Sequence, residues 1–285
     1  MGNENILGYP NGLKPGEYIA KPALELILHA KDHPDTPHFL ILDEMNLSHV
    51  ERYFADILSA IESGAPIPLH RETTMTAGEL NVPPSVVLPE NLFIIGTVNV
   101  DETTYMFSPK VLDRANVIEF RMAQSELTAF LSAPKAPNLD ALNGLGEGYG
   151  TAFVAVAKNK DITVPADVQE KFAAELALLF GLLQKHNAEF GYRVAYEAAR
   201  FMHFYKELSG APDDWFNDAM DAVIVQKLLP KLHGSRSKLE GLLEALAWLC
   251  ADGTSGISLS ASLRRKGCAT SQNPGRKPLR TSLWA

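Results

Sequence analysis

A short apolar run that stops at two adjacent carboxylates constrains the fold of this chain more than any other feature. Residues 39–42 read Phe-Leu-Ile-Leu, and Asp43 and Glu44 follow at once. Four apolar residues are too few for a buried helix, but they suit a strand that is covered on both faces. Ligands of open parallel sheets bind at the carboxyl ends of the strands, so these carboxylates would stand where a ligand binds. The alternative is a core strand that runs into a surface turn.

A second apolar run, residues 92–98, also ends in polar side chains, Asn99 and Asp101. A predicted amphipathic helix over 50–61 separates the two runs, which implies adjacent parallel strands with a right-handed connection. Both polar ends then point into the same crevice. A third strand is predicted over 116–120, after Leu112-Asp-Arg-Ala.

The other elements follow from apolar spacing and from breakers. Pro22 suits the first turn of a short helix, and Ser48 and Glu51 have the capping-box spacing expected before the 50–61 helix. Short paired strands are predicted within the Pro- and Gly-rich stretch 64–89. Four amphipathic helices are predicted later in the chain, over 168–183, 194–208, 215–229 and 239–249.

These elements predict an α/β part followed by a small helical bundle. The predicted organisation is an α/β subdomain over 1–125, a linker over 126–165, a helical subdomain over 166–250 and a disordered basic tail over 251–285.

Composition narrows the class of protein. With 285 residues, 46% of them hydrophobic, the chain can bury a sizeable core, and its formal charge of -8 disfavours nucleic-acid binding through the overall field. The two cysteines, Cys250 and Cys268, predict neither a disulfide framework nor structural zinc. No apolar run approaches the ~20 residues of a membrane span. We therefore expect a cytoplasmic protein that does not enter a membrane.

The order of these motifs resembles that of a known family. An apolar strand ending in Asp-Glu is the Walker B pattern of P-loop NTPases. With the strand before Asn99, the pair Asp113-Arg114 and a helical bundle following in order, the chain resembles the AAA+ NTPases. It is most similar to the McrB branch, the motor subunits of modification-dependent restriction systems, near the MoxR-like group. The most specific stretches are residues 42–56, 96–101 and 190–193.

The resemblance implies a role for each matching residue. Asp43 matches the Mg²⁺-binding position, Glu44 the catalytic glutamate and Asn99 the sensor 1 residue that helps to position the attacking water. Arg114 lies where the family has an arginine finger that reaches the neighbouring subunit, and Arg193 resembles the sensor 2 arginine of the lid. These residue types suit phosphoryl transfer, which depends on positioning and on neutralising charge.

Each of these residues also has a plainer interpretation. Asn99 would cap a turn, Arg114 would pair with Asp113 or Glu119, and Arg193 would be a surface arginine at a helix start. Asn46 and Asp101 are weaker candidates for residues that support the site.

The resemblance also implies cofactors and partners. They are Mg²⁺, GTP or ATP as substrate, a homo-oligomeric ring, an McrC-like nuclease subunit and DNA bound through the complex. The alternatives are a MoxR-like protein remodeller and a non-catalytic ring subunit that contributes only Arg114. No GxxxxGK[ST] occurs in the sequence. The phosphate-binding loop would therefore be supplied by another segment or be lost, and enzymatic activity stays open.

Overall fold

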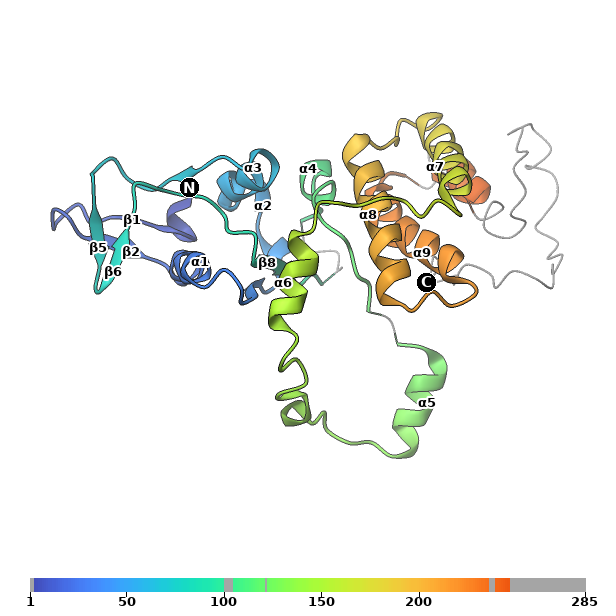
Figure 1. Cartoon of the computed structure of the whole chain (residues 1–285), viewed down its shortest axis with the longest axis horizontal. Coiled ribbons are helices and arrows are strands. Elements are labelled where there is room, and N and C mark those ends of the chain that lie inside the picture. The colour runs from blue at the N-terminus through green and yellow to red at the C-terminus, as the bar shows by residue number, and fades with distance from the viewer. Residues whose placement is uncertain (1–2, 100–104, 121, 236–238, 247–285) are drawn as a thin grey trace. The chain divides into compact units, whose positions relative to one another are not determined.

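The computed structural model describes residues 3–99, 105–120, 122–235 and 239–246, in two compact units of mixed α/β and α structure (Figure 1). The first unit comprises residues 1–114 and 120–161, and the second comprises residues 115–119 and 162–285. No helix in the described part of the chain is long and apolar enough to cross a bilayer.

A parallel pair of strands is the centre of the first unit. Strand β3 (His38–Leu42) pairs with β8 (Leu92–Gly96) in parallel, with His38 opposite Leu92 and Leu42 opposite Gly96. The predicted parallel pair is thus confirmed. Because the strands are paired end to end without a stagger, their carboxyl ends lie next to each other.

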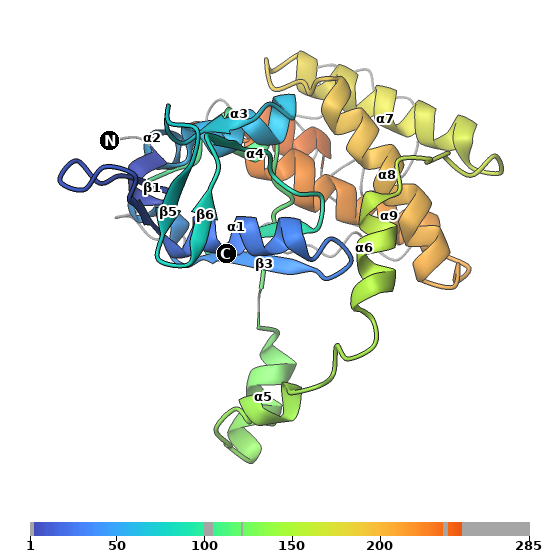
Figure 2. The same cartoon turned by 60° about the vertical axis from the view of Figure 1, so that its left-hand side comes forward.

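Helix α1 (Pro22–Asp32) lies alongside β3 (Figure 2). Its residues Leu24, Ile27 and Leu28 are buried, as their spacing predicted, and Pro22 occupies the first turn.

The predicted helix over 50–61 is divided in the structure, which corrects the sequence-based expectation. Helix α2 (Val50–Tyr53) and helix α3 (Ala55–Ser63) are separated by Phe54, which is itself buried. The predicted capping box is wrong as well. His49 and not Ser48 is the N-cap residue, and it makes no side-chain cap bond. Glu51 accepts a hydrogen bond from the Ser108 backbone N–H at 3.1 Å.

Short antiparallel pairs make up much of the remaining strand content. β1 (Gly8–Pro10) pairs with β2 (Tyr18–Ala20), after a 3-10 turn at Asn3–Asn5. Within the stretch 64–89, the predicted pairing is confirmed: β4 (Ile67–Pro68) pairs with β7 (Ser85–Val86), and β5 (Met75–Ala77) pairs with β6 (Leu80–Val82). These strand pairs pack with α1 and α3 around one hydrophobic core. The large side chains that are fully buried in this core include Leu7, Leu24, Ile27, Val50, Phe54, Ile57, Ile67 and Val82.

The third predicted strand is wrong. Residues 116–120 are described and form no strand; residues 115–119 belong to the second unit, where the Val117 N–H donates to the Gln226 carbonyl at 3.0 Å. This backbone group is therefore satisfied by a helical segment and not by a neighbouring strand.

The stretch expected to be a linker, 126–165, contains regular structure. Helix α4 (Pro109–Leu112) comes before this stretch. The stretch itself holds most of α5 (Gln124–Ser132), the 3-10 turn Leu139–Leu142 and α6 (Gly150–Lys158). All four elements belong to the first unit. Helix α6 contacts the parallel pair: the Phe153 ring lies 4.8 Å from the Phe93 ring and 6.1 Å from the Phe39 ring, centroid to centroid.

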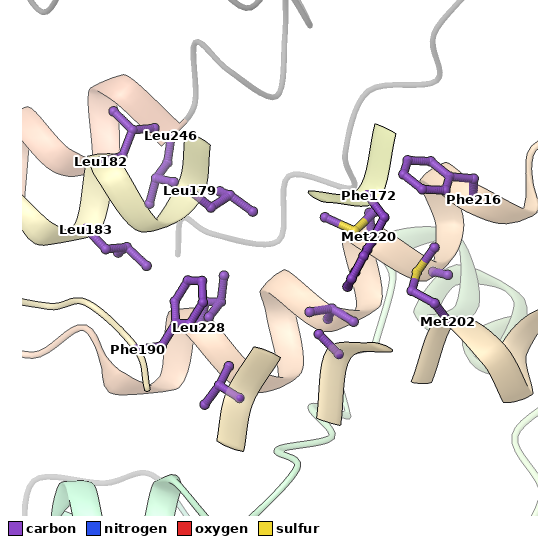
Figure 3. Packing of buried hydrophobic residues seen from close by; sticks show 14 of the residues in the cluster. Phe172, Leu179, Leu182, Leu183, Phe190, Met202, Phe216, Met220, Leu228 and Leu246 are labelled. Atoms are coloured by element: carbon purple, nitrogen blue, oxygen red, sulfur yellow. The ribbon is translucent and has the colours of Figure 1, made fainter. Parts of the chain in front are cut away.

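The second unit consists of the predicted helices. They are α7 (Gln169–Gln184), α8 (Tyr192–Leu208), α9 (Trp215–Val223) with the π-helical turn Ile224–Leu228 and the 3-10 turn Leu229–Lys231, and the helical residues 239–246. They share one apolar core (Figure 3), in which Met202, Ala219 and Leu242 are fully buried. The predicted tail over 251–285 lies outside the described residues.

The core of the second unit generates a stability prediction. Met202→Ala should lower its free energy of unfolding by about 2–5 kcal/mol, because the substitution removes buried side-chain volume and leaves a cavity. Tyr192→Ala on the same helix is the matched control, since Tyr192 is 97% exposed. Trp215 is buried in the core of the second unit, so urea unfolding followed by tryptophan fluorescence reports on that core. Equal midpoints for the two variants would contradict the prediction.

Candidate functional site

The polar residues that follow β3 and β8 are joined by side-chain hydrogen bonds. Thr97 Oγ1 donates to Asp43 Oδ1 at 2.5 Å and accepts from the Glu44 backbone N–H at 2.8 Å. Asn99 Nδ2 donates to Glu44 Oε1 at 3.3 Å. The structure therefore brings together three of the residues singled out from the sequence, Asp43, Glu44 and Asn99, at one end of the parallel pair.

Backbone hydrogen bonds continue the pairing past the last residues of the strands. The Thr97 N–H donates to the Leu42 carbonyl at 2.9 Å, and the Met45 N–H donates to the Thr97 carbonyl at 2.9 Å. Glu44 lies between these bonds with φ 47° and ψ 49°, the left-handed conformation. A residue with a Cβ atom adopts this conformation at a cost of about 1–2 kcal/mol. The bonds on either side hold it there, and strain of this kind is often found at functional sites.

Met45 packs closely over the end of β8. A Cβ atom built on Gly96 would lie 2.5 Å from the Met45 sulfur and 3.3 Å from the Met45 Cβ. A larger residue at position 96 would therefore require the flexible Met45 side chain to shift.

Asn46 connects the loop that follows β3 to the loop that follows β8. Its side chain is 3% exposed, its Nδ2 donates to the Asn99 carbonyl at 3.0 Å, and its own carbonyl accepts from the Tyr105 N–H at 3.0 Å. Tyr53 Oη adds a bond to the Met45 carbonyl at 2.9 Å. Asn46 thus supports the loop that carries Asn99, as the sequence suggested, while Asp101 lies outside the described residues.

The donor set suits a hard cation. Asp43 and Glu44 are exposed and present carboxylate oxygens, and the Thr97 hydroxyl lies beside them. Mg²⁺ prefers oxygen ligands and is usually bound by one or two carboxylates together with waters and substrate phosphates. Among the described residues no group of three or more His, Cys, Asp or Glu side chains is arranged to hold a metal. The oxygen donors present in the cluster are two carboxylates and a hydroxyl.

Arg114 lies immediately after α4 and is held within the first unit. Its guanidinium donates to the Glu62 carboxylate at the end of α3 and to the Lys110 carbonyl. The structure shows an ion pair with Glu62, which the sequence had not suggested, and the suggested pairing with Asp113 or Glu119 stays a prediction. Arg193 lies in the second unit, as the second residue of α8, and is partly exposed.

Two cavities lie away from these residues. One of about 680 Å³ in the first unit is lined by residues of the β1–β2 loop and of the stretch 68–75, and one of about 150 Å³ in the second unit is lined by residues including Arg200, Phe204 and Lys227. Neither is lined by a predicted site residue. The hydrogen-bonded cluster after β3 and β8 therefore remains the stronger candidate, because its polar groups converge.

Thr97 is a residue of the cluster for which sequence reasoning predicted no role. It bonds to both carboxylate-bearing residues, yet a threonine at the end of a strand is common and carries no chemical signature. Its importance depends on the register that places Leu42 opposite Gly96, and hence Thr97 beside Asp43.

Comparison with known proteins bears mainly on the second unit. A family model described as a domain of unknown function (DUF8727) matches residues 147–270. No curated protein matches the chain. The matched stretch includes Arg193 but none of Asp43, Glu44, Asn99 and Arg114, so the cluster is interpreted from its own geometry.

The Thr97 hydroxyl should hold the Glu44 turn closed. Thr97→Val keeps the shape but removes the acceptor of the Glu44 N–H, which should weaken local stability by about 1 kcal/mol and accelerate exchange of that amide hydrogen about fivefold. Thr97→Ser retains the hydroxyl and serves as the control. Hydrogen exchange followed by NMR at Glu44 measures the effect, and equal exchange in the valine and serine variants would contradict it.

Proposed function

We propose that Asp43, Glu44, Thr97 and Asn99 form the metal- and water-positioning half of a nucleoside-triphosphatase site of the AAA+ type. The observation that carries the proposal is the in-register parallel pairing of β3 and β8, which joins an Asp-Glu pair to a Thr and an Asn by hydrogen bonds. Ligand sites of parallel sheets lie at this end of the strands.

The chemistry assigns each residue a task. Asp43 would hold Mg²⁺, which neutralises phosphate charge when it is bound. Glu44 would accept hydrogen bonds from the attacking water and orient it. Asn99 already bonds to Glu44 Oε1, so it would keep that carboxylate in position for the water. Positioning and charge neutralisation of this kind account for most of the catalysis of phosphoryl transfer.

The sequence has no GxxxxGK[ST], so in this proposal another segment would supply the phosphate-binding loop, unless that loop has been lost. The parallel pair offers a surface for such an addition. Ile41 is 63% exposed and Ile95 is 44% exposed, although strands of parallel sheets are normally buried on both faces. Further polypeptide over this face would bury both side chains and complete the sheet.

Within the AAA+ proteins, the resemblance favours the McrB branch. The proposed activity is GTP or ATP hydrolysis that drives DNA translocation by a homo-oligomeric ring in the cytoplasm, together with an McrC-like nuclease subunit. A MoxR-like remodeller of proteins and a non-catalytic ring subunit are the alternatives. In the helical unit, Arg193 would act as the sensor 2 arginine.

Glu44→Gln tests the proposal in a complex that contains a P-loop-bearing segment, sought first in the coding sequence directly upstream. Turnover should fall by at least 100-fold while Mg-nucleotide binding is kept, because the amide removes the base but leaves Asp43 in place. Glu25→Gln, at an exposed position of α1, is the matched control.

Unchanged turnover in the Glu44→Gln complex would remove Glu44 from the mechanism. In the wild-type complex, stimulation by DNA favours the McrB branch and stimulation by a protein substrate favours the remodeller. No turnover in any complex favours the non-catalytic subunit.

Arg114 should act only in the assembled ring. As an arginine finger it would contribute about 10³–10⁵-fold to turnover, which should far exceed the effect of breaking its ion pair with Glu62. Arg114→Ala should therefore assemble but lose activity by orders of magnitude, whereas Glu62→Gln, which removes only the acidic partner, should retain it. Mixed rings of Arg114→Ala and Glu44→Gln chains should recover part of the turnover. An equal loss of turnover in the Arg114→Ala and Glu62→Gln variants would show that Arg114 has a structural role.

A further inference from the structure

We propose that His29 and His33 form a binding site for one divalent transition-metal ion, with Zn²⁺ as the leading candidate. Both residues lie at the C-terminal end of α1, and both are exposed. The site is next to the start of β3, whereas Asp43 and Glu44 follow its end, and it is independent of the nucleotide site proposed above.

The two imidazole rings are stacked on each other. His29 lies in the last turn of α1 and His33 is its C-cap residue, and the ring centroids are 4.1 Å apart with an interplanar angle of 24°. Two Zn–N bonds of about 2.0–2.1 Å in tetrahedral geometry place the nitrogens about 3.3 Å apart. Binding one ion therefore requires the two exposed rings to rotate out of the stacked arrangement until both Nε2 atoms point at the metal.

A chain of hydrogen bonds determines which nitrogen of His29 is available. His38 Nδ1 lies 2.8 Å from the Thr36 carbonyl, which can only accept, so His38 carries its proton on Nδ1. A contact with Asn91 Nδ2 at 3.3 Å is longer and does not reverse this assignment. His38 Nε2 is then an acceptor, and His29 Nδ1 donates to it at 2.9 Å. His29 therefore has its lone pair on Nε2.

His33 is fixed in the same tautomer by a different bond. Its Nδ1 lies 2.9 Å from the His29 carbonyl and must donate to it, which leaves the lone pair on Nε2. A histidine that binds a metal usually donates the N–H of its other ring nitrogen to a carboxylate, a backbone carbonyl or water. Two exposed Nε2 lone pairs are thus presented together.

A buried asparagine holds this arrangement in place. Asn91 is 1% exposed, and its Nδ2 lies 3.0 Å from the Ala30 carbonyl, 2.9 Å from that of His33 and 2.7 Å from that of Thr36. These contacts fix the end of α1 and the following turn, so little ordering is needed when a metal binds.

The ligand chemistry points to a borderline or soft divalent ion. Imidazole nitrogen suits Zn²⁺, Ni²⁺ and Cu²⁺, whereas Mg²⁺ and Ca²⁺ prefer oxygen. Because the described residues offer no third His, Cys, Asp or Glu ligand there, water or a partner molecule completes the coordination. The site should therefore be weaker than a closed structural zinc site and should exchange its metal readily.

The test is calorimetric titration of the full-length chain with ZnCl₂ at pH 7.5. One Zn²⁺ should bind per chain and raise the melting temperature as its concentration increases. The double variant His29→Gln/His33→Gln should lose at least tenfold in affinity, and each single variant should lose a comparable amount. His233→Gln, an exposed histidine of the other unit, is the matched control and should bind as the wild type does.

Two further measurements make the result decisive. Asp43→Asn should leave Zn²⁺ binding unchanged, which separates this site from the nucleotide site. Long-range ¹H–¹⁵N spectra should show Nδ1–H tautomers and a change at both Nε2 atoms on zinc addition. No Zn²⁺ binding by the wild type, or unchanged binding by the folded double variant, would overturn the proposal.

Discussion

The parallel pairing of β3 with β8 is the constraint on which the candidate site depends. Side chains at the ends of two strands meet only if the strands end together, and the pairing of Leu42 with Gly96 achieves this. A shift of one residue would turn each side chain to the opposite face and separate Thr97 from Asp43. The hydrogen bonds of the cluster therefore follow from register as much as from residue type.

Local strain is part of the same arrangement. Glu44 has the left-handed backbone conformation, and Met45 packs over Gly96, which has no side chain. Asn46 is buried between the loops that follow β3 and β8. Each feature alone would be unfavourable or unremarkable in a surface turn. Together with the backbone bonds of Thr97 they place a carboxylate within reach of an amide and a hydroxyl, which is how pre-organised sites are commonly built.

The two units differ in how fully their apolar faces are covered. In the helical unit, four helical segments share one apolar core, and such a bundle satisfies its own backbone groups. In the first unit, the parallel pair leaves Ile41 and Ile95 exposed on one face. Under the proposed NTPase function, further polypeptide that carries the phosphate-binding loop would cover this face. Helix α6 covers part of that face through Phe153.

The sequence by itself determined the helices and strands that have a regular apolar spacing, and it determined which polar side chains would lie together. Apolar spacing located α1, the strands β3 and β8 and the helices of the second unit, because burial of one face imposes a period that a sequence records. It also predicted that Asp43, Glu44 and Asn99 would meet. Only the tertiary structure decided the break at Phe54, the absence of a strand over 116–120, the role of Thr97 and the pairing of Arg114 with Glu62. These features depend on contacts between residues about 50 or more positions apart in most cases, or on a choice of backbone partner, and neither leaves a periodic pattern in the chain.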